Sequence, residues 1–492
     1  MSKKVVLIYP RYVTGWQVQT RLAIPLSLLC VGTKTSLAGY EVKTIDQRIE
    51  PDWRASLRRE LKQDPICVGI SSMTGPQLQF ALEISGFAKM HGSAPVVWGG
   101  VHPSLLPEQT LRHENIDIVV QGEGEETFLE LVQALEGKKP LSTVQGIWYK
   151  EDGDTKCTGV RPFADLNQLP PLSYDLIDLE KYRRVMFGLP HHNFFTSRGC
   201  PCQCTFCYNT AFNRKKWRAM EPELVVKRIK DFVTTYKVPG LIINESNFFV
   251  DMERARHILR GIIRENLGIV ISKVNIDVST LQRLKEDDFS LLERAGCRRL
   301  PIAIESGSEK IRTLLKKPAD VPSVIEMNRR LKETQMVPNF LFMIGFPTET
   351  KEDLAESVSL SFRLAEENPR AGIYFNIYAP YPGTELFDTA VKHGLHVPQQ
   401  VEDWIPFNYR NLIQNGPWLS EEMRKIVKMM DFCSFFIGER PLLEPTEETS
   451  RVASRLGKLY APLARIRAKR LWYRFPVEME LARFFRIYGK QN

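Results

Sequence analysis

The feature that most limits the fold of this chain is a repeated alternation of short apolar, β-branched runs with helical patterns. Two such series occur, one over residues 4–136 and one over about residues 193–390. Strands that alternate with helices form parallel sheets, because each helix returns the chain to the same edge of its sheet. A chain of 492 residues is also too long for one hydrophobic core. The sequence therefore predicts an α/β protein with two such domains.

The first series predicts a doubly wound domain over residues 1–140. The G-x-G-x-x-G fingerprint is absent after its first strand, which disfavours NAD and FAD. Ligands of such sheets bind at the carboxyl ends of the strands, where small residues let a large ligand approach the backbone. The candidate binding residues at these ends are Ser71, Ser72, Met73, Thr74, Gly99, Gly100, His102, Gly122 and Glu123.

The second series predicts an open, partial (β/α)6 barrel over residues 193–390. A connector at 141–192, marked by turn residues and prolines, precedes it, and a mostly helical region at 391–492 follows it. Barrels of this kind carry their chemistry at the carboxyl ends of the strands. The expected strands are Asn193–Ser197, Leu241–Asn244, Lys273–Asp277, Leu300–Glu305, Phe340–Gly345 and Ile373–Tyr378.

Four of the nine cysteines lie in the stretch RGCPCQCTFC, residues 198–207, directly after the first expected barrel strand. Cys200, Cys204 and Cys207 have the spacing C-x3-C-x2-C. Three thiolates so spaced can hold a [4Fe–4S] cluster and leave one iron open to a small chelating molecule. Cys202 lies inside the x3 gap, and we expect its side chain to point elsewhere. A zinc site is the alternative, but no second Cys/His pair follows within the next forty residues.

The motif CPCQCTFC resembles the signature of the radical S-adenosylmethionine (SAM) superfamily. The layout of about residues 1–440 is similar to that of the cobalamin-binding subgroup, in which a Rossmann-like corrinoid domain precedes a radical SAM partial barrel. The segments that carry this resemblance are PLSLLCVGTKTSLAGYEVKTID (25–46), VVWGGVHPSLLPEQTL (96–111), IVVQGEGEETFLEL (118–131), IAIESGSEKI (302–311), FMIGFPTET (342–350) and YPGTELF (381–387).

The resemblance implies an enzyme that uses a [4Fe–4S] cluster, SAM and cobalamin. A low-potential donor of the flavodoxin or ferredoxin type would reduce the cluster, which cleaves SAM to a 5′-deoxyadenosyl radical. That radical would abstract hydrogen from an unactivated carbon, and methylcobalamin would deliver a methyl group to it. The expected activity is therefore C-methyl transfer to a small-molecule or lipid-like substrate. Because the cofactors carry the chemistry, no side chain is assigned as a catalytic residue.

The resemblance also implies roles for individual residues. Cys200, Cys204 and Cys207 match the three cluster ligands, and the open iron would chelate the amino and carboxylate groups of SAM. The pair Glu305 and Ser306 matches a position near SAM at the end of the fourth barrel strand. The turn residues Gly345 and Pro347 match a position near the adenine after the fifth strand.

This chain departs from the subgroup at the second barrel strand, where Asn244 and Glu245 replace paired aspartates. Glu245 is therefore either a SAM contact or a helix-capping carboxylate. The chain also lacks D-x-H-x-x-G, a motif that the subgroup commonly lacks. We therefore expect a corrinoid to bind without a histidine of the chain on cobalt. His102 is either a donor to the corrin amides or a turn residue.

Three other functions remain open. The same cofactors support oxidative ring closure or rearrangement, as in the anaerobic tetrapyrrole cyclases of the subgroup. Methylthio transfer normally needs a second cysteine trio in the N-terminal domain, where Cys30, Cys67 and Cys157 are widely scattered. A zinc-dependent nucleic-acid-binding protein is the non-enzymatic alternative, and iron and sulfide analysis would separate it from the others.

The net charge of +9 is concentrated in residues 451–492, which hold eleven Lys/Arg against two glutamates. Basic residues interleaved with aromatics such as Trp472 and Phe475 are typical of a helix packed on a domain, a membrane-surface helix or a nucleic-acid surface. We favour packing, then peripheral membrane contact, and expect no nucleic acid. No apolar run is long enough to cross a bilayer and no leader pattern is present, so we expect a cytoplasmic location, with the inner face of the membrane as an option.

Overall fold

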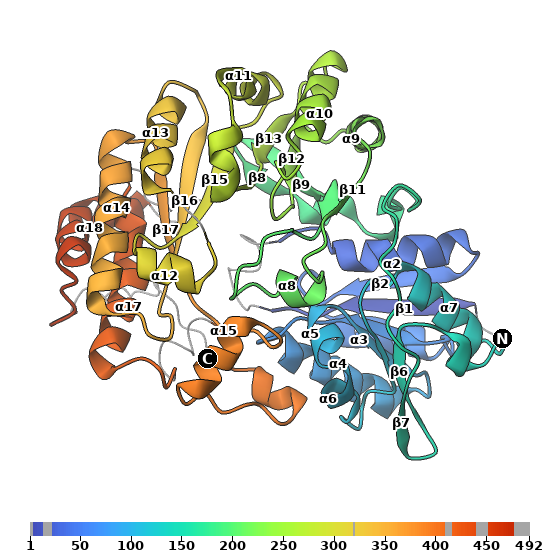
Figure 1. Cartoon of the computed structure of the whole chain (residues 1–492). Helices are drawn as coiled ribbons and strands as arrows, with labels where there is room; N and C mark the ends of the chain where they lie inside the picture. Colours follow the sequence, from blue (N-terminus) through green and yellow to red (C-terminus); the bar gives the residue numbers. More distant parts are fainter. Residues whose placement is uncertain (1–2, 13–21, 318–319, 409–415, 439–450, 477–492) are drawn as a thin grey trace. The chain divides into compact units, whose positions relative to one another are not determined.

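The computed structural model describes residues 3–12, 22–317, 320–408, 416–438 and 451–476 (Figure 1). The chain divides into two compact units. The first unit comprises Met1–Val185 with Tyr381–Gly383 and His396–Asn408. The second unit comprises Met186–Pro380, Thr384–Leu395 and Tyr409–Asn492.

The first unit is built on a seven-stranded sheet with the order β2-β1-β3-β4-β5-β6-β7. The first five strands are parallel, and the last two extend the sheet in antiparallel fashion. Buried runs such as Val5–Ile8 arise because helices cover both faces of a parallel sheet. The predicted doubly wound fold is confirmed. The strands are β1 (Lys4–Tyr9), β2 (Glu41–Asp46), β3 (Val68–Ser71), β4 (Val96–Gly99), β5 (Ile118–Val120), β6 (Ile147–Glu151) and β7 (Asp154–Cys157).

The helices of the first unit connect these strands and supply the second layer of its core. Phe128, Leu131 and Val132 of α7 pack with Leu28 of α2 against Val5 of β1. The helices are α2 (Leu26–Leu37), α3 (Trp53–Leu61), α4 (Gln77–His91), α5 (Val101–Leu105), α6 (Pro107–Leu111) and α7 (Glu125–Leu135).

A segment far along the chain, residues 396–408, also belongs to the first unit. Its 3₁₀ turn η5 (Val401–Trp404) buries Trp404, whose indole Nε1 donates a hydrogen bond to Gln109 Oε1 at 2.7 Å. The Gln109 amide in turn donates to the carbonyl of Pro398 at 2.9 Å. These contacts fix the segment on α4, α5 and α6 rather than leaving it part of a separate C-terminal region.

The second unit contains two four-stranded sheets, β13-β12-β9-β8 and β14-β15-β16-β17. A parallel bridge between Ile271 and Cys297 joins them, which gives the curved, open barrel that the sequence predicts. The strands are β8 (Arg184–Met186), β9 (Leu189–Phe194), β12 (Gly240–Ile243), β13 (Val270–Lys273), β14 (Ile276–Asp277), β15 (Arg299–Glu305), β16 (Val337–Ile344) and β17 (Gly372–Ile377). Between β9 and β12 in the chain, the short strands β10 (Ser197–Arg198) and β11 (Arg218–Ala219) pair with each other in antiparallel fashion.

The third expected barrel strand, Lys273–Asp277, is wrong in detail, because two strands take its place. The interruption has a local cause at Asn275. Its side-chain amide donates to the backbone carbonyl of Glu245 at 2.5 Å, and its backbone carbonyl accepts from the backbone amide of Phe248 at 3.0 Å. Backbone and side chain are thereby committed to the loop after β12 instead of to a neighbouring strand.

Helices follow the strands of the second unit, as expected for β/α units (Figure 1). Among the described residues after 415, the chain forms α17 and α18, which agrees with the mostly helical C-terminal region that the sequence predicts. Within the described ranges, no helix is long and apolar enough to cross a membrane. The helices are α8 (Asn209–Phe212), α9 (Pro222–Tyr236), α10 (Met252–Arg264), α11 (Glu286–Arg294), α12 (Glu309–Leu314), α13 (Val321–Lys332), α14 (Lys351–Glu367), α15 (Glu385–Lys392), α17 (Glu421–Cys433) and α18 (Arg451–Arg470).

Candidate functional site

The cysteine loop begins at a turn that only glycine can make. Gly199 has φ +84°, and a Cβ there would lie 2.0 Å from the carbonyl oxygen of Lys216. Farther along, the Thr205 amide donates to the carbonyl of Leu315 at 3.2 Å, and the Leu386 amide donates to the carbonyl of Thr205 at 2.9 Å. Thr205 is therefore attached by backbone hydrogen bonds to the end of α12 and the start of α15, which follow β15 and β17 in the chain.

All four cysteines of this loop are free thiols, and Cys204 is buried while the other three are partly buried. Cys200 and Cys202 are hydrogen bonded to each other, which lowers the pKa of Cys200 and raises that of Cys202. Burial raises the pKa of Cys204 to about 12 and also raises that of Cys207. Among the described residues, no three His, Cys, Asp or Glu side chains are arranged around one metal position.

The chemistry of this donor set fits an iron–sulfur cluster. Thiolates are the ligands that iron–sulfur clusters require, and the loop supplies them from a partly buried segment without a disulfide. The structure does not test which three of the four act as ligands. The trio Cys200, Cys204 and Cys207 therefore stays a prediction.

Glu245 follows β12 and is buried, but it does not cap a helix. The following helix, α10, is capped by Asp251, whose carboxylate accepts from the Arg254 amide at 3.0 Å. The helix-capping interpretation of Glu245 is therefore wrong. Its carboxylate instead accepts hydrogen bonds from Thr196 and Ser197, immediately before the cysteine loop.

Glu305 ends β15 in a strained, left-handed conformation, with φ +69°. Its carboxylate is buried and has no hydrogen-bond or ion-pair partner among the residues that the structure describes. Burial raises the pKa of Glu305 to about 7, although the Lys317 ammonium opposes this shift. A buried carboxylate without a partner is costly, so Glu305 is suited to a cationic group of a ligand.

A buried ion pair that the sequence analysis missed lies near Glu305. The ammonium of Lys317 is bonded to the carboxylate of Asp277 at the end of β14. Burial by itself would raise the pKa of Asp277 and lower that of Lys317, but their attraction reverses both shifts. No sequence motif marks this pair, because the two residues are 40 positions apart.

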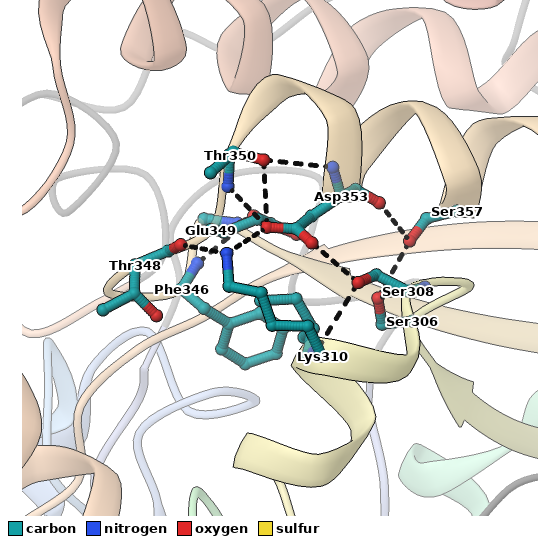
Figure 2. A network of polar contacts seen from close by, with 11 residues as sticks. Ser306, Ser308, Lys310, Phe346, Thr348, Glu349, Thr350, Asp353 and Ser357 are labelled. Atoms are coloured by element: carbon teal, nitrogen blue, oxygen red, sulfur yellow. Dashed lines mark hydrogen bonds and ion pairs between the residues drawn. The ribbon is translucent and has the colours of Figure 1, made fainter.

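Ser306 directs its hydroxyl to α14 rather than to open space (Figure 2). Its Oγ lies 3.0 Å from Oγ of Ser357, which also accepts from the Gly307 amide at 2.9 Å. Ser308 donates to Asp353 at 2.7 Å, and Lys310 forms an ion pair with the same carboxylate at 2.6 Å. The loop after β15 is thus joined to the first turns of α14.

Glu349 lies in the turn after β16 and stabilises this turn by hydrogen bonds to its backbone. Glu349 Oε2 accepts from the amide of Gly345 at 2.6 Å and from that of Phe346 at 3.4 Å, while Oε1 has no partner in the described part of the chain. Burial raises the pKa of Glu349 to about 8. Gly345 has φ +83°, and Pro347 is buried in the same turn. The sequence analysis missed Glu349, although the capping box from Thr350 to Asp353 follows it directly.

The carboxyl edge of the first unit presents backbone and small side chains. Met73 follows β3 and is 50% exposed, whereas Ser72 is fully buried, with an Oγ that lacks a partner within the described ranges. Gly100 has φ +103°, and a Cβ there would lie 2.5 Å from the carbonyl oxygen of Ser72. The close approach at Gly100 packs the end of β4 against the end of β3, whereas the orphaned Ser72 hydroxyl fits a ligand with many polar groups around a broad ring.

His102 lies below this edge and is not exposed on it. Its Nδ1 lies 3.0 Å from Thr74 Oγ1, and its ring meets Trp404 edge-on at 5.9 Å. Burial lowers the pKa of His102 to about 3, so the ring is neutral. Nε2 has no partner in the described residues.

The third expected ligand-binding loop of this edge is tied to its own unit. The Gly122 amide donates to Ser104 Oγ at 2.9 Å, and Glu123 accepts from the Ala164 amide at 3.0 Å. The Glu123 carboxylate thus fastens the polypeptide that follows β7. Gly99 and Gly122 leave the partly exposed backbone of their strand ends accessible.

Two family models match this chain. The radical SAM superfamily model matches residues 194–360, and the B12 binding domain model matches residues 21–132. Each match lies within one of the two compact units, and the first includes the whole cysteine loop.

Curated relatives match across both units. An uncharacterized methyltransferase of Pyrococcus horikoshii is 29% identical over 82% of this chain and 86% of its own length. The cytidylyl-2-hydroxyethylphosphonate methyltransferase of Streptomyces wedmorensis is 26% identical over 86% of this chain and 88% of its own. The anaerobic magnesium-protoporphyrin IX monomethyl ester cyclase of Cereibacter sphaeroides is 25% identical over 82% of this chain and 66% of its own.

The fold has a solved counterpart in the radical SAM methyltransferase TsrM of Kitasatospora setae, whose structure contains cobalamin and a [4Fe–4S] cluster. The TM-score is 0.71, with 17% identity, and the match covers 99% of this chain and 100% of TsrM.

The cysteine loop at the carboxyl edge of a partial barrel and the superfamily match together define a radical SAM enzyme. More narrowly, the chain resembles the cobalamin-binding subgroup of the radical SAM superfamily, because it combines the radical SAM domain with a B12 binding domain in its first unit. Its cofactors are those of the subgroup, namely a [4Fe–4S] cluster, SAM and cobalamin. The resemblance drawn from the sequence is confirmed.

Proposed function

We propose that this enzyme transfers a methyl group to an unactivated carbon. The observation that carries the proposal is the match of two methyltransferases over more than four-fifths of the chain, through both units. A domain match limited to the barrel would have supported radical chemistry alone. The bound cluster and SAM supply a hydrogen-abstracting radical, and cobalamin supplies the methyl carrier.

The residues of the second unit would bind and orient. Cys200, Cys204 and Cys207 would hold the cluster on the loop that follows β10. Glu305 would accept a hydrogen bond from the amino group of SAM, which keeps N–H donors when it binds the open iron, because its buried carboxylate lacks a described hydrogen-bond partner. The turn around Gly345, closed by Glu349, would lie along the adenine. Ser306 supports this site through α14 rather than by direct contact.

The residues of the first unit would bind the corrinoid mainly through backbone groups and small side chains. Gly99, Gly100 and Gly122 allow a close approach, and Ser72 offers an unpaired hydroxyl. Met73 is the large apolar side chain on this edge and would cover part of the corrin plane. His102 is directed into the unit beneath Trp404, which supports binding without imidazole on cobalt.

The test is anaerobic turnover with methyl-labelled SAM and a reducing system, on extracts of the source organism, followed by mass spectrometry. A new product that carries the label supports methyl transfer. Label that is found only in SAM and methionine, with an unlabelled product of altered mass, supports oxidative ring closure instead. The cyclase match keeps this second function in view.

Radical SAM enzymes need a reductant, and we propose a flavodoxin or ferredoxin type of donor for this chain. The natural electron donor should restore turnover when chemical reductant is omitted. We propose a small-molecule or lipid-like substrate, because the charge and apolar exposure of the C-terminal helix favour a location near membranes.

We also propose that α18 makes peripheral contact with anionic membrane. Leu459, Leu463 and Ile466 recur at helical spacing and are 78%, 38% and 48% exposed. Lys469 and Arg470 lie exposed in the last turn of the same helix. Each basic residue near an anionic surface contributes about 1 kcal/mol, and the apolar stripe would insert at the interface.

Liposome flotation tests this contact. The intact protein should float with anionic vesicles at low salt and less at high salt, because screening weakens the charge contribution. Leu463→Glu with Ile466→Glu should abolish flotation. Leu37→Glu is the matched control, since Leu37 of α2 is 67% exposed on the other unit. Failure of the intact protein to float would contradict the proposal.

A further inference from the structure

The strand that leads into the cysteine loop is bound by an acidic residue from another β/α unit. Glu245 Oε1 accepts a hydrogen bond from the backbone amide of Thr196 at 2.7 Å and one from the hydroxyl of the same residue. Its Oε2 accepts from the hydroxyl of Ser197 at 2.7 Å. Both oxygens of this buried carboxylate are therefore occupied by groups of the protein.

A buried arginine binds the same residue from the other side. Arg254 Nη2 donates to the carbonyl oxygen of Thr196 at 2.8 Å and to its Oγ1 at 2.9 Å. Arg254 Nε donates to the carbonyl of Met220 at 2.8 Å, and the Met220 amide donates back to the carbonyl of Thr196 at 3.0 Å. Thr196 is thus held between a carboxylate and a guanidinium, each with charge-assisted hydrogen bonds.

This network fixes the point from which the cysteine loop departs. Ser197 and Arg198 form β10, which pairs with Arg218 and Ala219 of β11 after the loop. Gly199 then makes the turn against the carbonyl of Lys216. Because only Arg198 and Gly199 separate Ser197 from Cys200, and both are held by these contacts, the position of Cys200 depends on how Thr196 and Ser197 are held.

We infer that Glu245 is the positioning residue of the cysteine loop, acting on the cluster through Thr196 and Ser197, and that it is not a SAM contact. The inference rests on the proposed cluster ligands. A carboxylate with three donors on its two oxygens has little capacity left for a ligand. Groups that orient metal ligands in this way typically change metal affinity about 10- to 100-fold when removed.

The experiment compares cluster loading and SAM affinity in Glu245→Ala and Glu245→Gln. Each full-length variant is reconstituted anaerobically over a range of iron and sulfide concentrations, and bound iron is measured. The concentration for half-loading should rise about tenfold in Glu245→Ala. Glu245→Gln should recover most of the loss, because its amide oxygen still accepts from Thr196.

The matched control is Asp288→Ala on α11. Asp288 is as buried as Glu245 and is paired with Arg256 at 2.7 Å, but it does not contact the loop. Its loading should equal that of the unsubstituted protein. If Glu245→Ala fails to fold, the comparison uses Glu245→Gln and Asp288→Asn instead. Cluster loading should then be about threefold weaker than in the unsubstituted protein for Glu245→Gln and unchanged for Asp288→Asn.

SAM affinity distinguishes positioning from direct contact. The change in the spectrum of the reduced cluster on SAM titration should give dissociation constants within about twofold for all loaded variants. Normal loading in Glu245→Ala, equal loss in Asp288→Ala, or normal loading with SAM affinity reduced tenfold would each overturn the inference. Cys204→Ala, assayed alongside, tests the proposed ligands separately, since its retention of the cluster would contradict those instead.

Discussion

The carboxyl edges of the two parallel-sheet units offer ligands very different chemistry. The edge of the first unit consists mainly of backbone and small side chains, and its histidine is buried and neutral. The edge of the second unit contains the buried charged residues Glu245, Asp277, Glu305 and Lys317. The first arrangement suits a broad ligand that brings its own polar groups, and the second suits compact, charged ligands.

The difference shows how to recognise a ligand position from burial and pairing. Buried charges are costly unless they are paired. Asp277 and Lys317 satisfy each other, and Glu245 is satisfied by Thr196 and Ser197. Glu305 has no hydrogen-bond or ion-pair partner in the described part of the chain, although the charge of Lys317 acts on it. The unpaired group therefore indicates where a charged ligand belongs, whereas the paired groups build the support around it.

The largest expected effect is the loss of the cluster from the second unit alone. Cys200→Ala, Cys204→Ala and Cys207→Ala should each abolish the visible absorbance of the reconstituted cluster, because three thiolates are needed to hold it. Cys202→Ala should retain it. Corrinoid uptake by the first unit should be unchanged in all four. Retention of the cluster in Cys204→Ala with loss in Cys202→Ala would contradict the assigned trio.

The next effect should be confined to the first unit. Gly100→Ala places a Cβ against the backbone of Ser72 at a positive φ, which costs about 1–3 kcal/mol in strain. Hydrogen exchange of β3 and β4 should accelerate, and corrinoid affinity should fall. Gly99→Ala is the control, because its nearest neighbour would lie 3.9 Å away. Equal effects from both substitutions would show that close approach at Gly100 is unimportant.

A smaller effect concerns pH and the charged edge. Because the pKa of Glu349 is raised from 4.5 to about 8, the folded state holds its proton more tightly. The free energy of unfolding should therefore fall as pH rises from 4.5 to about 8. Glu349→Gln should flatten this dependence in pH-dependent denaturation of the protein.

The contribution of Asp353 to the pH dependence of the free energy of unfolding has the opposite sign, and Asp353→Asn should remove it. The pKa of Asp353 is lowered from 3.8 to about 2; burial opposes this shift, but bonds from Lys310, Thr350 and Ser308 outweigh it. Its stabilisation is present above pH 3.8 and is lost as pH falls towards about 2. A flat profile between pH 4.5 and about 8 in the unsubstituted protein would argue against a buried, unpaired oxygen at Glu349.

The smallest expected effect is that of His102→Gln, which we predict leaves the ligands of cobalt unchanged. Protein loaded with cob(II)alamin should show no nitrogen splitting from a lower ligand in electron paramagnetic resonance. His102→Gln should give the same spectrum, because the imidazole lies beneath Trp404. A clear imidazole signal that His102→Gln removes would show that His102 binds cobalt. It would contradict the view that the edge of the first unit binds mainly through backbone and small side chains.

Part of the site could be predicted from sequence because its signals are local. The spacing of Cys200, Cys204 and Cys207 and the glycine-rich strand ends are contained in short stretches of chain. Glu349 also bonds within its own turn, so a closer reading of FPTET could have identified it. The role of Glu245 could not be read this way, because its partners lie 49 and 48 residues earlier.

The sequence by itself determined the two α/β units, the cysteine loop and the family, because periodicity and motif spacing depend only on neighbouring residues. Tertiary structure alone decided which charges are paired. It brought Lys317 to Asp277 and Glu245 to Thr196, and it left Glu305 without a described partner. It also returned residues 396–408 to the first unit. Burial and pairing of distant residues depend on how strands are ordered in a sheet, and no local pattern specifies that order.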